Sequence, residues 1–185
     1  MTFVAARTAL IAVDLMPRIV EQNMGPHRGA DVVARTAALA DALRRAGGVV
    51  VPVRVERPHV DTQPPGSDLV PEMAPQPGDI LIVKRTIGAF YGTGLADRLR
   101  ERDITTVIMA GLVTTMGVES TARAAADHGF DLLFAADAMS GPAAAEHEHA
   151  LSTTLPRFGT VHDTAQLLDL LAAAAGNGGR AATPA

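Results

Sequence analysis

The sequence predicts an α/β fold, in which a doubly wound sheet of six parallel strands is flanked by helices on both faces. Three observations lead to this prediction. Six short apolar segments recur along the 185 residues. Stretches with apolar residues at helical spacing separate them, as expected when each strand is followed by a crossover helix. The longest apolar segments contain no alternating polar residues, which is typical of strands buried on both faces.

The expected strands are segments rich in β-branched and small apolar residues. The first, residues 8–15 (TALIAVDL), is an apolar run that reaches the carboxylate of Asp14. The second, residues 49–55, is interrupted only by Pro52. The other four cover residues 80–83, 106–110, 132–136 and, more weakly, 160–161.

Helices are expected between these strands. In residues 29–46 the apolar side chains recur at helical spacing, and Arg44 and Arg45 lie near the end. Gly47 and Gly48 follow directly, as is typical of a helix C-terminus. We expect further helices at residues 95–102, 118–128, 143–155 and 164–174.

Two segments fall outside this alternation. Residues 56–78 are rich in proline, and we expect a long surface loop of the kind that often carries function. Residues 176–185 (GNGGRAATPA) have low complexity and are expected to form a flexible C-terminal tail. No repeat or linker divides the remainder, so residues 1–175 are expected to form a single domain.

Composition excludes several classes of function. Sixteen Lys and Arg against twenty Asp and Glu give a net charge of −4, so we expect neither nucleic acid nor a membrane surface as a partner. Aromatic residues make up only 3%, which disfavours base stacking. The absence of cysteine excludes disulfides and a thiol nucleophile. The apolar runs are too short for a membrane helix or a signal peptide, so we expect a cytoplasmic protein.

Polar residues follow three of the expected strands, where ligands bind in an open parallel sheet. Asp14 follows the first strand, Lys84 and Arg85 follow the third, and the turn at residues 111–117 follows the fourth. An ammonium beside a carboxylate shifts the pKa of both groups, which is typical of a proton-transfer pair and also of a structural salt bridge. The spacing leaves both interpretations open.

The turn at residues 111–117 leads into a helix whose first amides favour an anion or a developing oxyanion. Ser120 and Thr121 lie in the first turns of that helix. They could act as nucleophiles, but hydroxyls at helix starts are far more often caps. Thr114 and Thr115 lie closer to the strand end, where they can hydrogen-bond a small substrate.

We expect no metal and no cofactor. His147 and His149 are two residues apart on an expected helix, so their side chains point in different directions and cannot share a metal there. His59 and Asp61 have no third ligand beside them in sequence. Neither a phosphate-binding loop nor a dinucleotide fingerprint is present.

Three segments together resemble the signatures of the isochorismatase-like hydrolases. They are the strand that reaches Asp14, the segment VKRTIGAFYGTGL with Lys84, and AGLVTTMGVESTARAA with Gly117. The resemblance spans residues 8–171. It implies a Rossmann-like three-layer sandwich, self-association as a homodimer or tetramer, and a non-proline cis peptide in the turn at Val113–Thr114.

The resemblance also bears on mechanism, because the amidase branch of this family has a nucleophilic cysteine where this chain has Gly117. Thiolate attack on an amide is therefore excluded. Isochorismatases resemble this chain in having glycine there, since vinyl-ether hydrolysis needs a general acid and water. This resemblance implies that Asp14 protonates the methylene carbon of an enolpyruvyl group, while Lys84 holds Asp14 and the substrate's negative charge. Such an acid needs a raised pKa, which apolar surroundings supply and an ammonium opposes.

The residues before this glycine depart from the isochorismatase pattern. In the isochorismatase pattern an Ala-His pair precedes this glycine, whereas this chain has Thr114 and Thr115 there. The segment after the glycine, VESTARAA, resembles the amidase branch instead. Three interpretations stay open: acid–base hydrolysis of a vinyl ether or related small substrate, another non-covalent biosynthetic reaction, or a binding role without turnover. For the first, Asp14 and Lys84 are the expected catalytic pair. The expected substrate-binding residues are Phe90, Val113, Thr114, Thr115 and Gly117.

Overall fold

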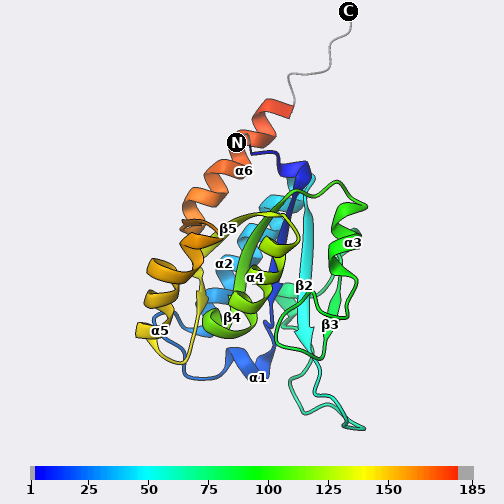
Figure 1. The fold of residues 1–185 in the computed structure, drawn as a ribbon, viewed down its shortest axis with the longest axis vertical. Helices are drawn as coiled ribbons and strands as arrows, with labels where there is room; N and C mark the ends of the chain where they lie inside the picture. The colour runs from blue at the N-terminus through cyan, green and yellow to red at the C-terminus, as the bar shows by residue number, and fades with distance from the viewer. Residues whose placement is uncertain (1–2, 179–185) are drawn as a thin grey trace, which may run out of the picture.

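The computed structural model describes residues 3–178 and contains the predicted six-stranded parallel sheet (Figure 1). Its strand order is β3-β2-β1-β4-β5-β6, and every neighbouring pair is parallel. The predicted fold class is therefore confirmed. The strands are β1 (Thr8–Val13), β2 (Val49–Val55), β3 (Ile82–Lys84), β4 (Thr106–Leu112), β5 (Asp131–Ser140) and β6 (Gly159–His162).

The central strands are buried on both faces, as their unbroken apolar sequences predict. Every residue of β1 and β4 is buried. Because side chains alternate between the two faces of a strand, β1 contributes to two separate cores. Ile11 and Val13 belong to one core, and Leu10 and Ala12 belong to the other.

Helices cover both faces and complete a three-layer sandwich (Figure 1). One core is shared with α2 (Gly29–Arg45) and α6 (Thr164–Gly178). The opposite core is shared with α3 (Leu95–Arg100) and α4 (Glu119–Asp127). The remaining α-helices of residues 3–178 are the short α1 (Pro17–Val20) and α5 (Ala144–His149). Among residues 3–178, no helix combines the length and the apolar character needed to cross a membrane.

Several element boundaries differ from those predicted. Strand β5 continues beyond residue 136 to Ser140, and its register with β4 shifts between Met109 and Gly111. The single helix expected at residues 143–155 is divided into α5, a π-helical turn and a 3-10 turn at Leu155–Arg157. Pro156 explains the last change, because proline has no amide hydrogen to continue the α-helical bonds.

The C-terminal helix is longer than predicted. Helix α6 extends to Gly178, so residues 176–178 are helical and the expected tail does not begin at residue 176. Four consecutive alanines precede these residues, and alanine has the highest helix propensity. The rest of the predicted tail, residues 179–185, lies outside the described residues.

The sheet topology brings the candidate site residues to one edge. Strand order reverses at β1, which pairs with β2 on one side and β4 on the other. Val13 is paired with both Val53 and Gly111, so the segments that follow β1 and β4 start side by side. Lys84 ends β3 opposite Val55. This edge is the switch point at which doubly wound sheets bind ligands.

Candidate active site

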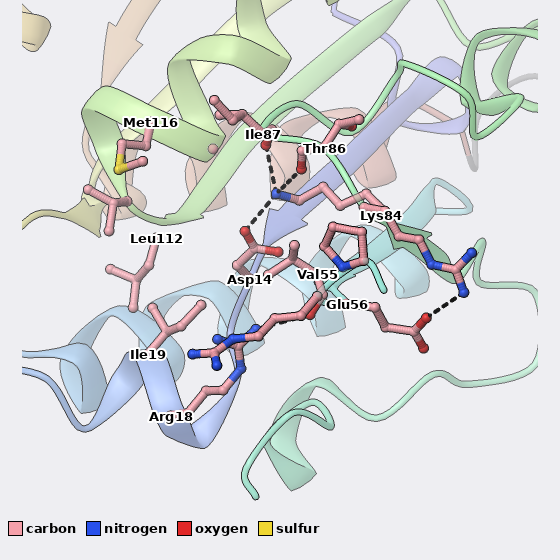
Figure 2. A pocket seen from close by; sticks show the side chains of 15 residues that line it. Asp14, Arg18, Ile19, Val55, Glu56, Lys84, Thr86, Ile87, Leu112 and Met116 are labelled. Carbon is pink, nitrogen blue, oxygen red and sulfur yellow. Dashed lines mark hydrogen bonds and ion pairs between the residues drawn. The ribbon is translucent and has the colours of Figure 1, made fainter. Parts of the chain in front are cut away.

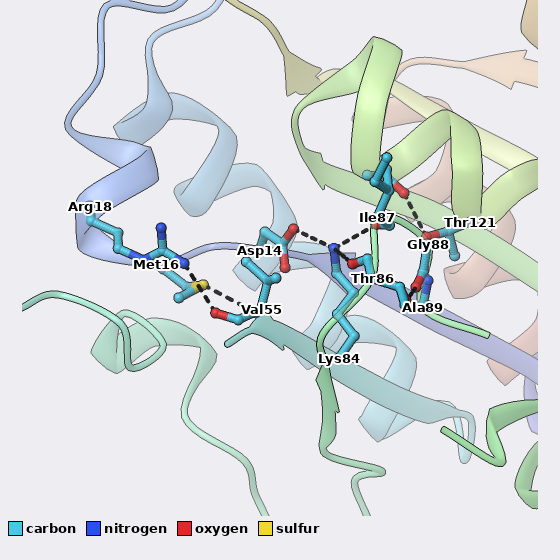
Figure 3. A network of polar contacts seen from close by, with 11 residues as sticks. Asp14, Met16, Arg18, Val55, Lys84, Thr86, Ile87, Gly88, Ala89 and Thr121 are labelled. Atoms are coloured by element: carbon cyan, nitrogen blue, oxygen red, sulfur yellow. Dashed lines mark hydrogen bonds and ion pairs between the residues drawn. The ribbon is translucent and has the colours of Figure 1, made fainter. Parts of the chain in front are cut away.

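A buried ion pair between Asp14 and Lys84 lies at the switch point (Figure 3). Lys84 Nζ is 2.7 Å from Asp14 Oδ2, and the two side chains are only 2% and 8% exposed. The same ammonium donates hydrogen bonds to the carbonyl oxygens of Ile87, at 2.7 Å, and Thr86, at 3.4 Å. An ammonium has three N–H donors. All three donors of Lys84 therefore have acceptors within the protein.

The pKa of the Asp14 carboxyl is shifted by its surroundings. Burial raises its pKa above the ordinary value of 3.8, and this effect outweighs the opposing charges of Lys84 and Arg18. Oδ2 is bound to Lys84, whereas Oδ1 is buried and has no hydrogen-bond partner among residues 3–178. The backbone of Asp14 adopts a left-handed conformation with φ +52°. Aspartate tolerates this conformation better than most residues.

Gly117 faces the ion pair from the turn after β4. A Cβ at this position would lie 3.0 Å from Val13 Cγ1 and 3.3 Å from Asp14 Oδ2. The backbone of Gly117 lies in a π-helical turn, Thr114–Val118, that leads into α4. A side chain at position 117 would therefore lie against the Asp14 carboxyl, closer than an ordinary van der Waals contact.

The Thr121 hydroxyl links two segments of the site. It is buried, donates to the carbonyl oxygen of Gly117 at 2.6 Å and accepts from the amide of Ala89 at 3.0 Å. Thr121 thus joins α4 to the loop that surrounds the Lys84 ammonium (Figure 3). Of the two interpretations of this hydroxyl, the geometry favours the structural one.

A cavity of about 370 Å³ opens beside the ion pair (Figure 2). Its wall combines charged side chains with a larger set of apolar ones. Ile87 and Met116 are 58% and 56% exposed, which places two apolar side chains in contact with solvent at the cavity. The lining residues are Asp14, Arg18, Ile19, Val55, Glu56, Arg57, Pro58, Lys84, Arg85, Thr86, Ile87, Leu112, Val113, Met116 and Gly117.

Some charged side chains of this wall form ion pairs, and others do not. Glu56 accepts from Arg54 at 2.9 Å and from Arg85 at 3.1 Å, and Asp14 is paired with Lys84. Arg18 and Arg57 form no ion pair within the described residues 3–178. The cavity therefore carries cationic groups that no carboxylate of the described chain neutralises.

The structure brings some of the predicted binding residues to the cavity and separates others from it. Val113 and Gly117 line it. Thr115 is half-buried and does not belong to the lining. Phe90 does not belong to the lining either: its ring lies in the hydrophobic core, and its centroid is 6.1 Å from that of the Phe130 ring. Burial of a large apolar ring explains this position.

Thr114 is also absent from the cavity wall. It is fully buried, with its hydroxyl 3.0 Å from the carbonyl oxygen of Ser140 and 2.8 Å from His147 Nδ1. The imidazole of His147 is itself buried, and burial lowers its pKa from 6.5 to about 4. These residues support the back of the turn that carries Gly117.

Sequence reasoning missed several residues of the site. Arg18 could have been found from the sequence, because it lies four residues after Asp14, in the short helix that begins at Pro17. Thr86 and Ile87 contribute backbone carbonyls to Lys84, and such groups leave no trace in residue type. Among residues 3–178, no three His, Asp or Glu side chains lie together in a way that could hold a metal ion.

Comparison with known proteins identifies the family. The isochorismatase domain model matches residues 8–166. This chain belongs to the isochorismatase family of hydrolases. An uncharacterised isochorismatase family protein of Escherichia coli O157:H7, YecD, is 37% identical in an alignment 183 positions long; the match covers 90% of this chain and 97% of YecD.

Other known proteins resemble the chain in structure or in part of the sequence. A solved isochorismatase family structure from Burkholderia thailandensis has a TM-score of 0.82 and 33% identity, covering 90% of this chain and 96% of that one. The ureidoacrylate amidohydrolase RutB of Methylobacterium radiotolerans is 37% identical over 99 residues, or 52% of this chain and 38% of RutB.

The non-proline cis peptide that the family resemblance implied is present in the turn after β4. It joins Leu112 to Val113, one bond earlier than the predicted position at Val113–Thr114.

Proposed function

We propose that this isochorismatase-family hydrolase acts without a covalent nucleophile and uses Asp14 as a general acid and base. Lys84 is its electrostatic partner, and the substrate is a small polar or acidic molecule. Vinyl-ether hydrolysis of the isochorismate type is the most concrete reaction. The observation that carries this proposal is the Asp14 carboxyl, which has a raised pKa and an unpartnered Oδ1 and faces Gly117 in place of a nucleophile.

The proposed reaction begins with proton transfer from Asp14 to the methylene carbon of the enolpyruvyl ether. The resulting oxocarbenium ion is captured by water, which returns a proton to the Asp14 carboxylate. The hemiketal then collapses, its C–O bond breaks, and pyruvate and the alcohol leave. The ammonium 2.7 Å from Oδ2 stabilises the carboxylate that the first step creates, because opposite charges interact strongly in a buried site.

Position 117 supports a non-covalent route. The chain contains no cysteine, and glycine offers no nucleophilic atom. The cavity that Asp14 and Gly117 both line provides the room for substrate and for the attacking water. Ser120 and Thr121 do not belong to the cavity lining, so no hydroxyl of α4 supplies a nucleophile in its place.

The test is pyruvate release from isochorismate by the purified protein. Steady turnover that is abolished by Asp14→Asn is the expected result. Asp103→Asn is the matched control, since Asp103 is exposed and shares a left-handed backbone with φ +56°, and it should retain turnover. Absence of pyruvate from folded protein would reject this substrate and favour another non-covalent reaction or a binding role. Equal turnover by the Asp14→Asn variant would reject the role of Asp14.

We also propose that the protein self-associates as a dimer or tetramer, in line with the family resemblance. Sedimentation equilibrium should then give a mass that is a multiple of 19.2 kDa. A monomer at micromolar concentration would contradict this proposal without affecting the proposed chemistry.

A further inference from the structure

We propose that Arg18 binds a carboxylate of the substrate, and that the cavity selects small carboxylic acids with an apolar body. This inference rests on the proposed function in one respect: the cavity beside Asp14 is taken as the place where substrate binds. It assigns the anion-binding role to Arg18, whereas the family resemblance led us to expect that role for Lys84.

Lys84 has no donor left for a ligand. Its three N–H groups are directed to Asp14 Oδ2 and to the carbonyl oxygens of Thr86 and Ile87. Its side chain is 2% exposed. A substrate anion could reach this ammonium only by displacing one of these acceptors, which are part of the buried structure.

Arg18 has donors to spare. Its Nη2 donates to the carbonyl oxygen of Val55 at 3.1 Å, which anchors the side chain (Figure 3). Nη1 makes no hydrogen bond and no ion pair within residues 3–178. The planar guanidinium carries five N–H donors in a geometry that suits carboxylate oxygens. One Nη2 donor is bonded to Val55 and the Nε donor is buried, so the three other donors, on Nη1 and Nη2, are left for a ligand.

The other cations of the cavity fit this role less well. Arg85 is already paired with Glu56 at 3.1 Å. Arg57 is exposed, and an exposed side chain gains little from binding an anion because water competes. Arg18 is half-buried and lies close enough to Asp14 for its charge to lower the pKa of that carboxyl. Arg18 can thus hold a carboxylate near the proton donor.

The rest of the wall defines the body of the ligand. Ile19 follows Arg18 in the same helix, and Val55, Leu112, Val113 and Met116 complete an apolar surface. Burying a ring or chain against these side chains is favourable in proportion to the apolar area removed from water. The cavity therefore combines one cationic anchor with an apolar wall, and a small cyclic or branched carboxylate has that combination of groups.

Binding can be tested apart from turnover. Isothermal titration of the Asp14→Asn protein with benzoate and with its neutral analogue benzamide measures recognition without proton transfer. We expect benzoate to bind more tightly than benzamide. Adding Arg18→Met should weaken benzoate binding by about tenfold or more and leave benzamide binding within about twofold. Arg18→Lys, which retains the charge, should keep part of the benzoate affinity.

The matched control is Arg98→Met. Arg98 also donates to a single carbonyl oxygen, that of Leu81 at 3.1 Å, and lies outside the cavity. This variant should bind benzoate as the parent protein does. The assignment would be overturned if benzoate did not bind the folded Asp14→Asn protein, or if adding Arg18→Met left its affinity for benzoate unchanged. Neither result depends on whether isochorismate is hydrolysed, so failure of this inference is distinguishable from failure of the proposed function.

Discussion

Asp14 and Lys84 show how two opposed effects set the chemistry of one residue. Removing a carboxyl from water raises its pKa, and an ammonium at hydrogen-bond distance lowers it. In this site burial has the larger effect, so the pKa of Asp14 is raised. The ammonium is shared between Asp14 and two backbone carbonyls. The pair therefore connects β1 and β3 with the loop at residues 86–87.

Breaking this pair from one side should be costly. Lys84→Met leaves the buried Asp14 carboxyl without its cation, and we expect the free energy of unfolding to fall by about 3–5 kcal/mol. The double variant Lys84→Met/Asp14→Asn removes both charges and should be more stable than Lys84→Met alone. Urea unfolding at neutral pH measures both values. Additive losses from the two substitutions would show that the charges do not interact.

The space at Gly117 can be tested with a single methyl group. In Gly117→Ala the added Cβ would lie 3.0 Å from Val13 Cγ1 and 3.3 Å from Asp14 Oδ2, so the neighbours must shift slightly. We expect turnover to fall by about tenfold or more, because the methyl group occupies space beside the acid. Gly141→Ala is the control, since its Cβ meets only Val113 Cγ1, at 3.4 Å. Equal activities of the two variants would show that this space is not used.

At the scale of the element, the turn between β4 and α4 is held by two hydroxyl groups that do not line the cavity. The Thr114 hydroxyl contacts the carbonyl oxygen of Ser140 and His147 Nδ1. The Thr121 hydroxyl donates to the carbonyl oxygen of Gly117. Each hydroxyl satisfies polar groups that would otherwise be buried without partners. The position of Gly117 beside Asp14 thus depends on side chains behind the turn.

Removing one of these hydroxyls should loosen the turn. Thr114→Val keeps the shape of the side chain but leaves the Ser140 carbonyl and His147 Nδ1 without this partner, so we expect a loss of about 1–3 kcal/mol in the free energy of unfolding. Thr115→Val, at the half-buried neighbouring position, should change it by less than about 0.5 kcal/mol. Thermal and urea unfolding compare the two variants. A similar effect at both positions would contradict the role of Thr114.

At the scale of the whole molecule, two buried groups oppose one another in their effect on stability against pH. His147 has a folded pKa of about 4, below its ordinary 6.5, so its contribution is present above pH 6.5 and is lost as pH falls toward 4. Asp14 has a folded pKa above 3.8, so its contribution is present below pH 3.8 and is lost as pH rises through the folded pKa.

Variants separate these two contributions. From pH 3.8 up to the folded pKa of Asp14, Asp14→Asn should make stability rise more steeply with pH than in the parent protein. Between pH 4 and 6.5, His147→Gln should make it rise less steeply. Each change is limited to about 1.4 kcal/mol per pH unit, the value of one proton. Urea unfolding at half-unit pH steps measures the slopes, and parallel curves for all three proteins would refute both assignments.

Much of this molecule could be predicted from its sequence. The apolar runs predicted six parallel strands, and polar residues after them predicted that Asp14, Lys84 and the turn with Gly117 meet at one edge. These predictions follow from local pattern and from a general property of parallel sheets, whose carboxyl ends share an edge. The start of β2 and its end at Val55 were likewise predicted, because β-branched residues and flanking polar ones define them.

Other properties depend on contacts between segments far apart in the chain, and no local pattern records them. Phe90 lies in the core beside Phe130. Thr114 lies away from the cavity, where its hydroxyl donates to the carbonyl oxygen of Ser140 and is 2.8 Å from His147 Nδ1. Whether the pKa of Asp14 lies above or below its ordinary value depends on how deeply the folded chain buries the carboxyl. By itself, the sequence determined the family, the sheet and the meeting of Asp14 with Lys84 at one edge. Only the tertiary structure decided which cation remains available to a ligand, because hydrogen-bond saturation of Lys84 depends on carbonyls that have no signature in residue type.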